Sequence, residues 1–202
     1  MTGPMTGFEA GTTLHTGRLM LRPPRADDAD GVFAAVDAEV RRWMPWAQGG
    51  YTRDQALDWC VRLAHQDPAH ATNFAMTATG RLAGWIGLSR ANWVDGRAEI
   101  GYWLAPWARK RGYATEAVTA VCAYGFATGL HRIELLAATG NHASQRVAER
   151  AGFTREGVLR EAELHARGRV DLVLFGLLSR ELPGSGASRN GGRRPGPGEE
   201  PK

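Results

Sequence analysis

Three cations followed by a glycine, Arg109 to Gly112, form the part of the chain best suited to chemistry. The residues before them, Arg97 to Leu104, alternate as a strand does, and the residues after them are good helix formers. The first N–H groups of a helix lack partners, and the helix dipole favours negative charge at that end. The sequence therefore predicts a phosphate-binding site at residues 109–115, with the carboxylate of Glu99 one strand away.

Hydrophobic patterns along the chain predict an α+β domain with a mixed sheet. The predicted strands, about seven in number, are 14–22, 73–78, 82–89, 97–104, 132–138, 154–161 and 170–178. The predicted helices, about four in number, are 27–36, 53–66, 112–128 and 143–151. Thr52 is expected to cap the second helix and Gly152 to end the fourth. Residues 41–50 are expected to form a loop that carries two tryptophans.

The composition is that of one globular domain, with 202 residues, 43% of them hydrophobic and 23% charged. We expect this domain to span residues 13–180. Residues 1–12 are expected to be flexible, and the Gly-, Pro- and Arg-rich residues 183–202 to form a disordered tail. The net charge is +4, but the basic residues are scattered. This scatter argues against a nucleic-acid partner.

Cysteine usage and hydropathy favour a cytoplasmic protein. Cys60 and Cys122 lie in apolar helical patterns and are expected to be free, buried thiols. No run of 18 apolar residues is present, so no membrane span is expected, and the first ten residues lack the features of a secretion signal. The six histidines lack metal-ligand spacing, so no metal is expected.

Three motifs resemble the GNAT superfamily of N-acyltransferases. Residues 109–114 resemble its pyrophosphate-binding signature, Gln/Arg-x-x-Gly-x-Gly/Ala, with alanine in the last place. Residues 141–153 resemble the next motif, Asn-x-x-Ser followed by a short helix and Gly-Phe. Residues 99–104, together with residues 14–22, are similar to the Rim-type branch, which acetylates the N-termini of ribosomal proteins. The resemblance covers about residues 14–180.

The resemblance implies a strongly twisted sheet in which two central parallel strands, those of Glu99 and Leu135, splay apart. It implies acetyl-CoA or another acyl-CoA as co-substrate, with its pantetheine arm in the gap and its pyrophosphate at the helix start. The residues implied to bind it are Trp103, Leu104, Arg109, Lys110, Arg111, Gly112, Tyr113, Ala114, Thr115, Asn141 and Ser144.

The implied reaction is direct transfer of the acyl group to a primary amine in a ternary complex. An α-amine has a pKa of about 8 and a lysine amine of about 10.4, so a protein N-terminus is the easier nucleophile at neutral pH. Glu99 is the first candidate for the general base, and Glu163 is its competitor or partner. Ser144 is the candidate donor to the departing sulfur, because Phe175 stands where many family members carry a tyrosine.

Several alternatives stay open. The acyl group could be succinyl, and the acceptor could be an antibiotic or metabolite amine. A third reading is a catalytically silent acyl-CoA sensor or nucleic-acid-associated module. Glu99 could instead pair with an arginine, Ser144 could satisfy its own helix, and Asn141 could cap that helix as well as contact pantetheine. Trp43 and Trp46 could pack in the core or line the acceptor cleft, and a homodimer is one option for the assembly.

Overall fold

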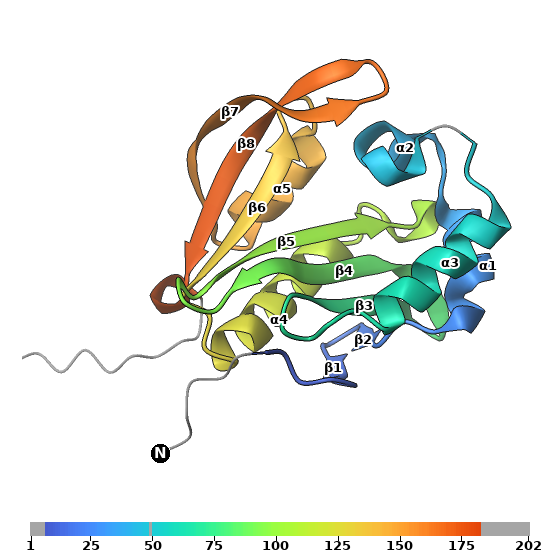
Figure 1. The fold of residues 1–202 in the computed structure, drawn as a ribbon, viewed down its shortest axis with the longest axis horizontal. Helices are drawn as coiled ribbons and strands as arrows, with labels where there is room; N and C mark the ends of the chain where they lie inside the picture. Colours follow the sequence, from blue (N-terminus) through green and yellow to red (C-terminus); the bar gives the residue numbers. More distant parts are fainter. Residues whose placement is uncertain (1–6, 49, 183–202) are drawn as a thin grey trace, which may run out of the picture.

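The computed structural model describes residues 7–48 and 50–182, which form an eight-stranded mixed sheet flanked by helices (Figure 1). The strands are β1 (Leu14–His15), β2 (Met20–Arg22), β3 (Thr72–Ala78), β4 (Arg81–Asn92), β5 (Arg97–Leu104), β6 (Arg132–Ala138), β7 (Thr154–His165) and β8 (Gly168–Leu178). The α-helices are α1 (Ala29–Ala35), α2 (Ala38–Trp43), α3 (Arg53–Ala64), α4 (Tyr113–Ala127) and α5 (His142–Arg150). Short 3₁₀ turns are η1 (Ala26–Asp28), η2 (Pro45–Ala47), η3 (Pro106–Ala108) and η4 (Ser179–Glu181). The predicted α+β class is confirmed.

The sheet is ordered β1-β2-β3-β4-β5-β6-β8-β7, and its helices cover both faces. Trp85 of β4 packs against Trp59 of α3, whereas Leu88 of the same strand packs toward Gly125 of α4. Residues an odd number apart on a strand point to opposite faces, so α3 and α4 lie on opposite sides. The core between these layers contains the fully buried side chains Phe74, Phe175, Leu21, Met76, Ile86, Leu88, Ile100, Ile133, Leu135 and Leu177.

The central strands β5 and β6 are parallel and pair over three positions alone, the last joining Glu99 to Glu134. Beyond this point β5 stays paired with β4 as far as Leu104, and β6 stays paired with β8 as far as Ala138. The two strands therefore part and leave a gap between two half-sheets (Figure 1). The expected splay of the central parallel pair is confirmed.

Three boundaries differ from the expectation. The strand predicted over 14–22 is a hairpin of two short strands, because the N–H of Thr16 donates to the carbonyl of Leu19 and turns the chain. This split accounts for the eighth strand. The predicted loop 41–50 is partly helical, because the Asp37 side chain caps α2 by accepting from the N–H groups of Glu39 and Val40. Strand β7 extends to His165 and strand β8 begins at Gly168, so the last hairpin is longer than expected.

The two ends of the chain, residues 1–12 and 183–202, lie outside the predicted domain limits. The tail expected to be disordered, 183–202, lies outside the described residues, as do residues 1–6. Within the expected flexible N-terminus, Phe8 is 5% exposed and packs edge-on against Trp93. The N–H of Phe8 also donates to the carbonyl of Pro68 (2.9 Å). The described chain is therefore packed against the domain at Phe8.

We predict that Gly84→Ala lowers the free energy of unfolding by about 3 kcal/mol or prevents folding. A Cβ at this position would lie 2.2 Å from the carbonyl oxygen of Trp103 and 2.9 Å from the Cα of Leu104. Both are backbone atoms of β5, so the strands would have to move apart. Denaturant unfolding followed by circular dichroism measures the change.

The matched control is Gly157→Ala on β7, where an added Cβ meets nothing within 4 Å. We expect it to change the unfolding free energy by less than about 0.5 kcal/mol. Equal stabilities for the two variants would show that β4 and β5 do not need this close approach.

Candidate active site

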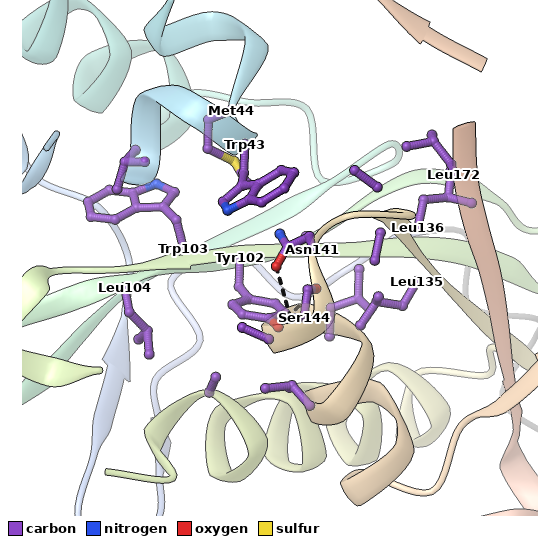
Figure 2. A pocket seen from close by; sticks show the side chains of 18 of the residues that line it. Trp43, Met44, Tyr102, Trp103, Leu104, Leu135, Leu136, Asn141, Ser144 and Leu172 are labelled. Carbon is purple, nitrogen blue, oxygen red and sulfur yellow. Dashed lines mark hydrogen bonds between the residues drawn. The ribbon is translucent and has the colours of Figure 1, made fainter. Parts of the chain in front are cut away.

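The gap between β5 and β6 opens into a cavity of about 1270 Å³ (Figure 2). Its walls are the diverging residues 99–104 and 135–138, the start of α4, the face of α5, the segment 39–46 and the β7–β8 hairpin. Because β5 and β6 do not pair here, their facing backbone N–H and C=O groups are available to a ligand. A cavity of this size exceeds the roughly 300–1,000 Å³ usual for small-molecule sites, so it has room for two substrates.

One end of the cavity is the N-terminus of α4. Gly112 caps the helix with φ of 80°, in the left-handed region that favours glycine, and the first helical bond runs from Glu116 N–H to the Gly112 carbonyl. The N–H groups of the first turn, from Tyr113 to Thr115, therefore have no intrahelical acceptor. They lie where the sequence predicts an anion site, and Gly112, Ala114 and Thr115 line the cavity there.

The three cations of this loop behave differently from one another. Arg109 forms a bidentate ion pair with Asp37 (2.7 and 2.8 Å) and also donates to the carbonyl of Leu104. Arg111 donates from Nε to the carbonyl of Trp107 (3.0 Å) and does not line the cavity. Lys110 lines the cavity, and its ammonium group bonds no other residue within 7–48 and 50–182. Arg109 also lines the cavity, but its guanidinium is engaged by Asp37 and Leu104, and Nε of Arg111 is engaged by Trp107. That all three cations bind phosphate stays a prediction.

The remaining residues expected at the co-substrate site divide in the same way. Trp103 and Leu104 on β5, and Asn141 and Ser144 at α5, line the cavity. Tyr113 does not, because its ring packs against Trp107.

Glu99 lies at the point where β5 and β6 part, and its side chain is 26% exposed. Arg90 Nη1 donates to Glu99 Oε2 at 3.0 Å. Burial nevertheless raises the pKa of Glu99, and the charges of Glu134 and Glu163 add to this effect, while Arg90 opposes it. A carboxylate with a raised pKa in a cavity is a stronger base than a free one, which suits proton abstraction.

Glu163 lies across the cavity on β7 and accepts a hydrogen bond from Nε2 of His165 (2.7 Å). The structure therefore brings both predicted carboxylates to one cavity, although 64 positions separate them in the chain. His165 holds Glu163 in place from the same strand. This histidine was not predicted from the sequence, although its i+2 spacing from Glu163 on a strand was the available signal.

A pair of hydroxyl groups forms the third feature of the cavity. Tyr102 Oη donates to Ser144 Oγ at 3.1 Å, and burial raises the pKa of Tyr102 to about 12. The N–H of Ser144 donates to Asn141 Oδ1, so Asn141 caps α5 as one of its expected roles required (Figure 2). Phe175, which stands where many family members carry a tyrosine, is fully buried on β8 and does not line the cavity. Tyr102 of β5 does line the cavity.

The segment from α2 to η2 forms the wall opposite the α4 end. Trp43, Met44, Pro45 and Trp46 all line the cavity, and Trp46 also stacks on Trp59 with ring centroids 4.9 Å apart. Trp46 therefore both packs against the core and lines the cavity, whereas Trp43 lines the cavity. Gly101 lies between Glu99 and Trp103 on the same face of β5, where an added Cβ would meet nothing within 4 Å.

Two further features concern membrane-spanning helices and metal-binding groups. Across the described ranges, 7–48 and 50–182, no helix is both long and apolar enough to cross a membrane. Among these same residues no three His, Cys, Asp or Glu side chains are grouped so that they could hold a metal ion.

Comparison with known proteins assigns the chain to a family. A family model described as the acetyltransferase (GNAT) domain matches residues 18–154. YdaF of Bacillus subtilis, whose name proposes a ribosomal N-acetyltransferase, is 40% identical over 172 residues, which cover 82% of this chain and 92% of YdaF. The N-acetyltransferase p20 of Bacillus licheniformis is 34% identical over 178 residues, which cover 85% of this chain and 99% of p20.

A solved structure agrees with these relatives. RimJ of Mycobacterium smegmatis, determined in complex with a CoA-disulfide, superposes with a TM-score of 0.72 at 25% identity, covering 82% of this chain and 84% of RimJ. The chain belongs to the GNAT acetyltransferases and is an N-acetyltransferase, and its similarity to YdaF and RimJ supports the Rim-type branch.

Proposed function

We propose that the enzyme acetylates the α-amino group of a protein N-terminus by direct attack on acetyl-CoA. The observation that carries this proposal is the position of Glu99, where β5 and β6 part, in the cavity that also holds the Tyr102–Ser144 pair and the start of α4. A base, a hydrogen-bond donor and an anion site thus face one space.

The co-substrate is proposed to lie along the gap, with its pyrophosphate at the start of α4. The N–H groups of the first turn and the ammonium of Lys110 suit a pyrophosphate there. The unpaired edges of β5 and β6 suit the amides of the pantetheine arm. Because β5 and β6 diverge after Glu99, the thioester is directed toward the side of the cavity that carries Glu99 and Glu163.

The acceptor amine must be neutral when it attacks, and Glu99 is the proposed base. The amine nitrogen forms a bond to the thioester carbon, its surplus proton passes to Glu99, and the carbon–sulfur bond breaks as the tetrahedral intermediate collapses. Glu163 lies on the same cavity and its negative charge favours an approaching ammonium group. An α-amine loses its proton more easily than a lysine side chain does, which favours N-termini.

The departing sulfur is proposed to receive a hydrogen bond from Ser144. The raised pKa of Tyr102, about 12, keeps its phenol protonated, so it donates to Ser144 Oγ. This bond leaves the hydroxyl hydrogen of Ser144 free to point into the cavity. Tyr102 is therefore a polarising partner, while the donor that faces the sulfur is Ser144.

The experiment that tests the function measures acetyl transfer from acetyl-CoA to peptides with free N-termini. We expect a free α-amine to be acetylated, and the same peptide with a blocked N-terminus but a free lysine to react at least about tenfold more slowly, because the lysine amine is more protonated at pH 7.5. Mass spectrometry of the products locates the acetyl group. Exclusive transfer to small-molecule amines, or to lysine, would overturn the N-terminal assignment, and succinyl-CoA in a parallel assay tests the donor.

We predict that Glu99→Gln lowers kcat by about 10²-fold, the usual contribution of a general base. Because the pKa of Glu99 lies above its ordinary value, its basic form is lost as pH falls through that raised pKa. Wild-type activity should therefore fall on the acid side at a pH above the usual glutamate range, and the variant should lack this limb. The pH profile of kcat, with Glu163→Gln as comparison, provides the measurement; if Glu163→Gln alone removes the acid limb, Glu163 is the base.

We predict that Lys110→Met weakens binding of coenzyme A about tenfold, as expected when one charge-assisted contact to a phosphate is lost. Arg111→Met should weaken it less, because Arg111 is bonded to the Trp107 carbonyl outside the cavity. Isothermal titration calorimetry measures both affinities, and Arg53→Met, whose ion pair with Asp30 is exposed on another part of the surface, is the control. The opposite order of losses would assign the phosphate contact to Arg111.

A further inference from the structure

Arg109 stands in the pyrophosphate-binding loop, yet its side chain is engaged elsewhere. Nη1 and Nη2 pair with the two carboxylate oxygens of Asp37, and Nε and Nη2 donate to the carbonyl of Leu104, where β5 ends. The pair is partly buried, with exposed side-chain fractions of 28% for Arg109 and 34% for Asp37. A phosphate would have to break a bidentate pair in order to take this guanidinium.

Asp37 carries the other end of this connection. Its Oδ1 accepts from the N–H groups of Glu39 and Val40, so it is the N-cap of α2, and the bond from Arg109 lowers its pKa. α2 has six residues, and a helix this short is not stable on its own. Its position depends on its cap and on the groups that hold the cap.

α2 in turn places Trp43 across the cavity. The indole Nε1 of Trp43 donates to Glu39 Oε1 (2.8 Å), which fixes the ring against its own helix. The far edge of the ring lies 3.5 Å from where a Cβ of Gly140 would stand, next to Asn141 at the start of α5 (Figure 2). The ring therefore spans from the α2 wall to the turn that carries Asn141 and Ser144.

We propose that Arg109 and Asp37 are a positioning pair that joins the pyrophosphate-binding loop to the acceptor-side wall of the cavity. Arg109 lies in the same loop as Lys110 and Gly112. A co-substrate bound to this loop therefore orders it, and with it the Arg109 side chain that holds Asp37. Asp37 then fixes α2 and the Trp43 ring over the place where the acceptor meets the thioester. The role in acceptor binding rests on the proposed function, whereas the mechanical connection does not.

Asp37→Asn tests the pair selectively. Asparagine caps a helix as well as aspartate does, so α2 keeps its cap, but the charge that holds Arg109 is lost. We expect the KM for the acceptor peptide to rise about tenfold, with kcat at saturation and the affinity for coenzyme A changed less than about twofold. Arg109→Met should give the same pattern, and Arg109→Lys a smaller rise, because lysine keeps the charge and loses the bidentate geometry.

A control variant separates this effect from the loss of any ion pair. Asp30→Asn removes the exposed pair between Asp30 and Arg53, which joins α1 to α3 outside the cavity, and should leave all three parameters unchanged. The double variant Asp37→Asn with Arg109→Met should raise the acceptor KM no further than either single variant does, because all three remove the same pair.

Amide hydrogen exchange gives a readout that does not need turnover. Exchange of residues 38–44 should be faster in Asp37→Asn and Arg109→Met than in the wild type. Coenzyme A should slow it in the wild type and have a smaller effect in both variants. If wild-type enzyme acetylates no peptide, the proposed function fails, and exchange still decides whether the pair holds α2.

Two results would overturn the inference. A tenfold loss of coenzyme A affinity in Arg109→Met, with exchange of residues 38–44 unchanged, would make Arg109 a phosphate ligand. An acceptor KM that stays at the wild-type value in both Asp37→Asn and Arg109→Met would show that the position of α2 does not matter to the acceptor.

Discussion

The early end of pairing between β5 and β6 is the constraint on which the rest of the site depends. Each strand keeps its outer neighbour, so the sheet remains one structure while its two halves diverge after Glu99 and Glu134. The backbone groups left facing each other need partners, because an unpaired buried amide is costly. An extended, amide-bearing co-substrate can supply these partners, so the proposed binding site lies where the pairing of the sheet is incomplete.

The same divergence sets the electrostatics of the cavity. Glu99 and Glu134 come side by side at the last paired position, which helps to raise the pKa of Glu99. Arg132 donates to Glu134 (2.8 Å), and the same guanidinium also pairs with Glu156. Several arginines of this arginine-rich chain thus bind its own carboxylates. Arg18, which pairs with Glu116 in the first turn of α4, follows the same pattern.

Local patterns predicted the fold well where neighbouring residues decide it. The sequence from β5 to α4 was predictable because strand alternation, a left-handed glycine and helix formers follow one another within about thirty residues. The turn inside 14–22 was missed because the Thr16–Leu19 bonds that form it leave little trace in hydrophobicity. Short α2 was missed because its stability comes from a cap and from tertiary contacts more than from its own residues.

The site was predictable in its members and much less so in their partners. Glu99 and Ser144 reach the cavity from elements that the motifs located, and Glu163 reaches it from β7, which extends beyond the predicted strand end at residue 161. The bonds from Tyr102 to Ser144 and from Arg109 to Asp37 join residues 42 and 72 positions apart. No local pattern specifies such pairs, because they depend on the register and packing of elements that the chain brings together only on folding.

Gly101 shows how this register affects stability as well as chemistry. A glycine inside a strand costs roughly 0.5–1 kcal/mol relative to alanine, since its unfolded backbone has more freedom to lose. Among residues 7–48 and 50–182 nothing lies within 4 Å of where its Cβ would stand, so the fold itself does not require a residue without a side chain. Strand β5 therefore keeps an unfilled space between Glu99 and Trp103 at the expense of rigidity. Selection for heat resistance alone would be expected to replace Gly101 with a residue whose side chain fills this space.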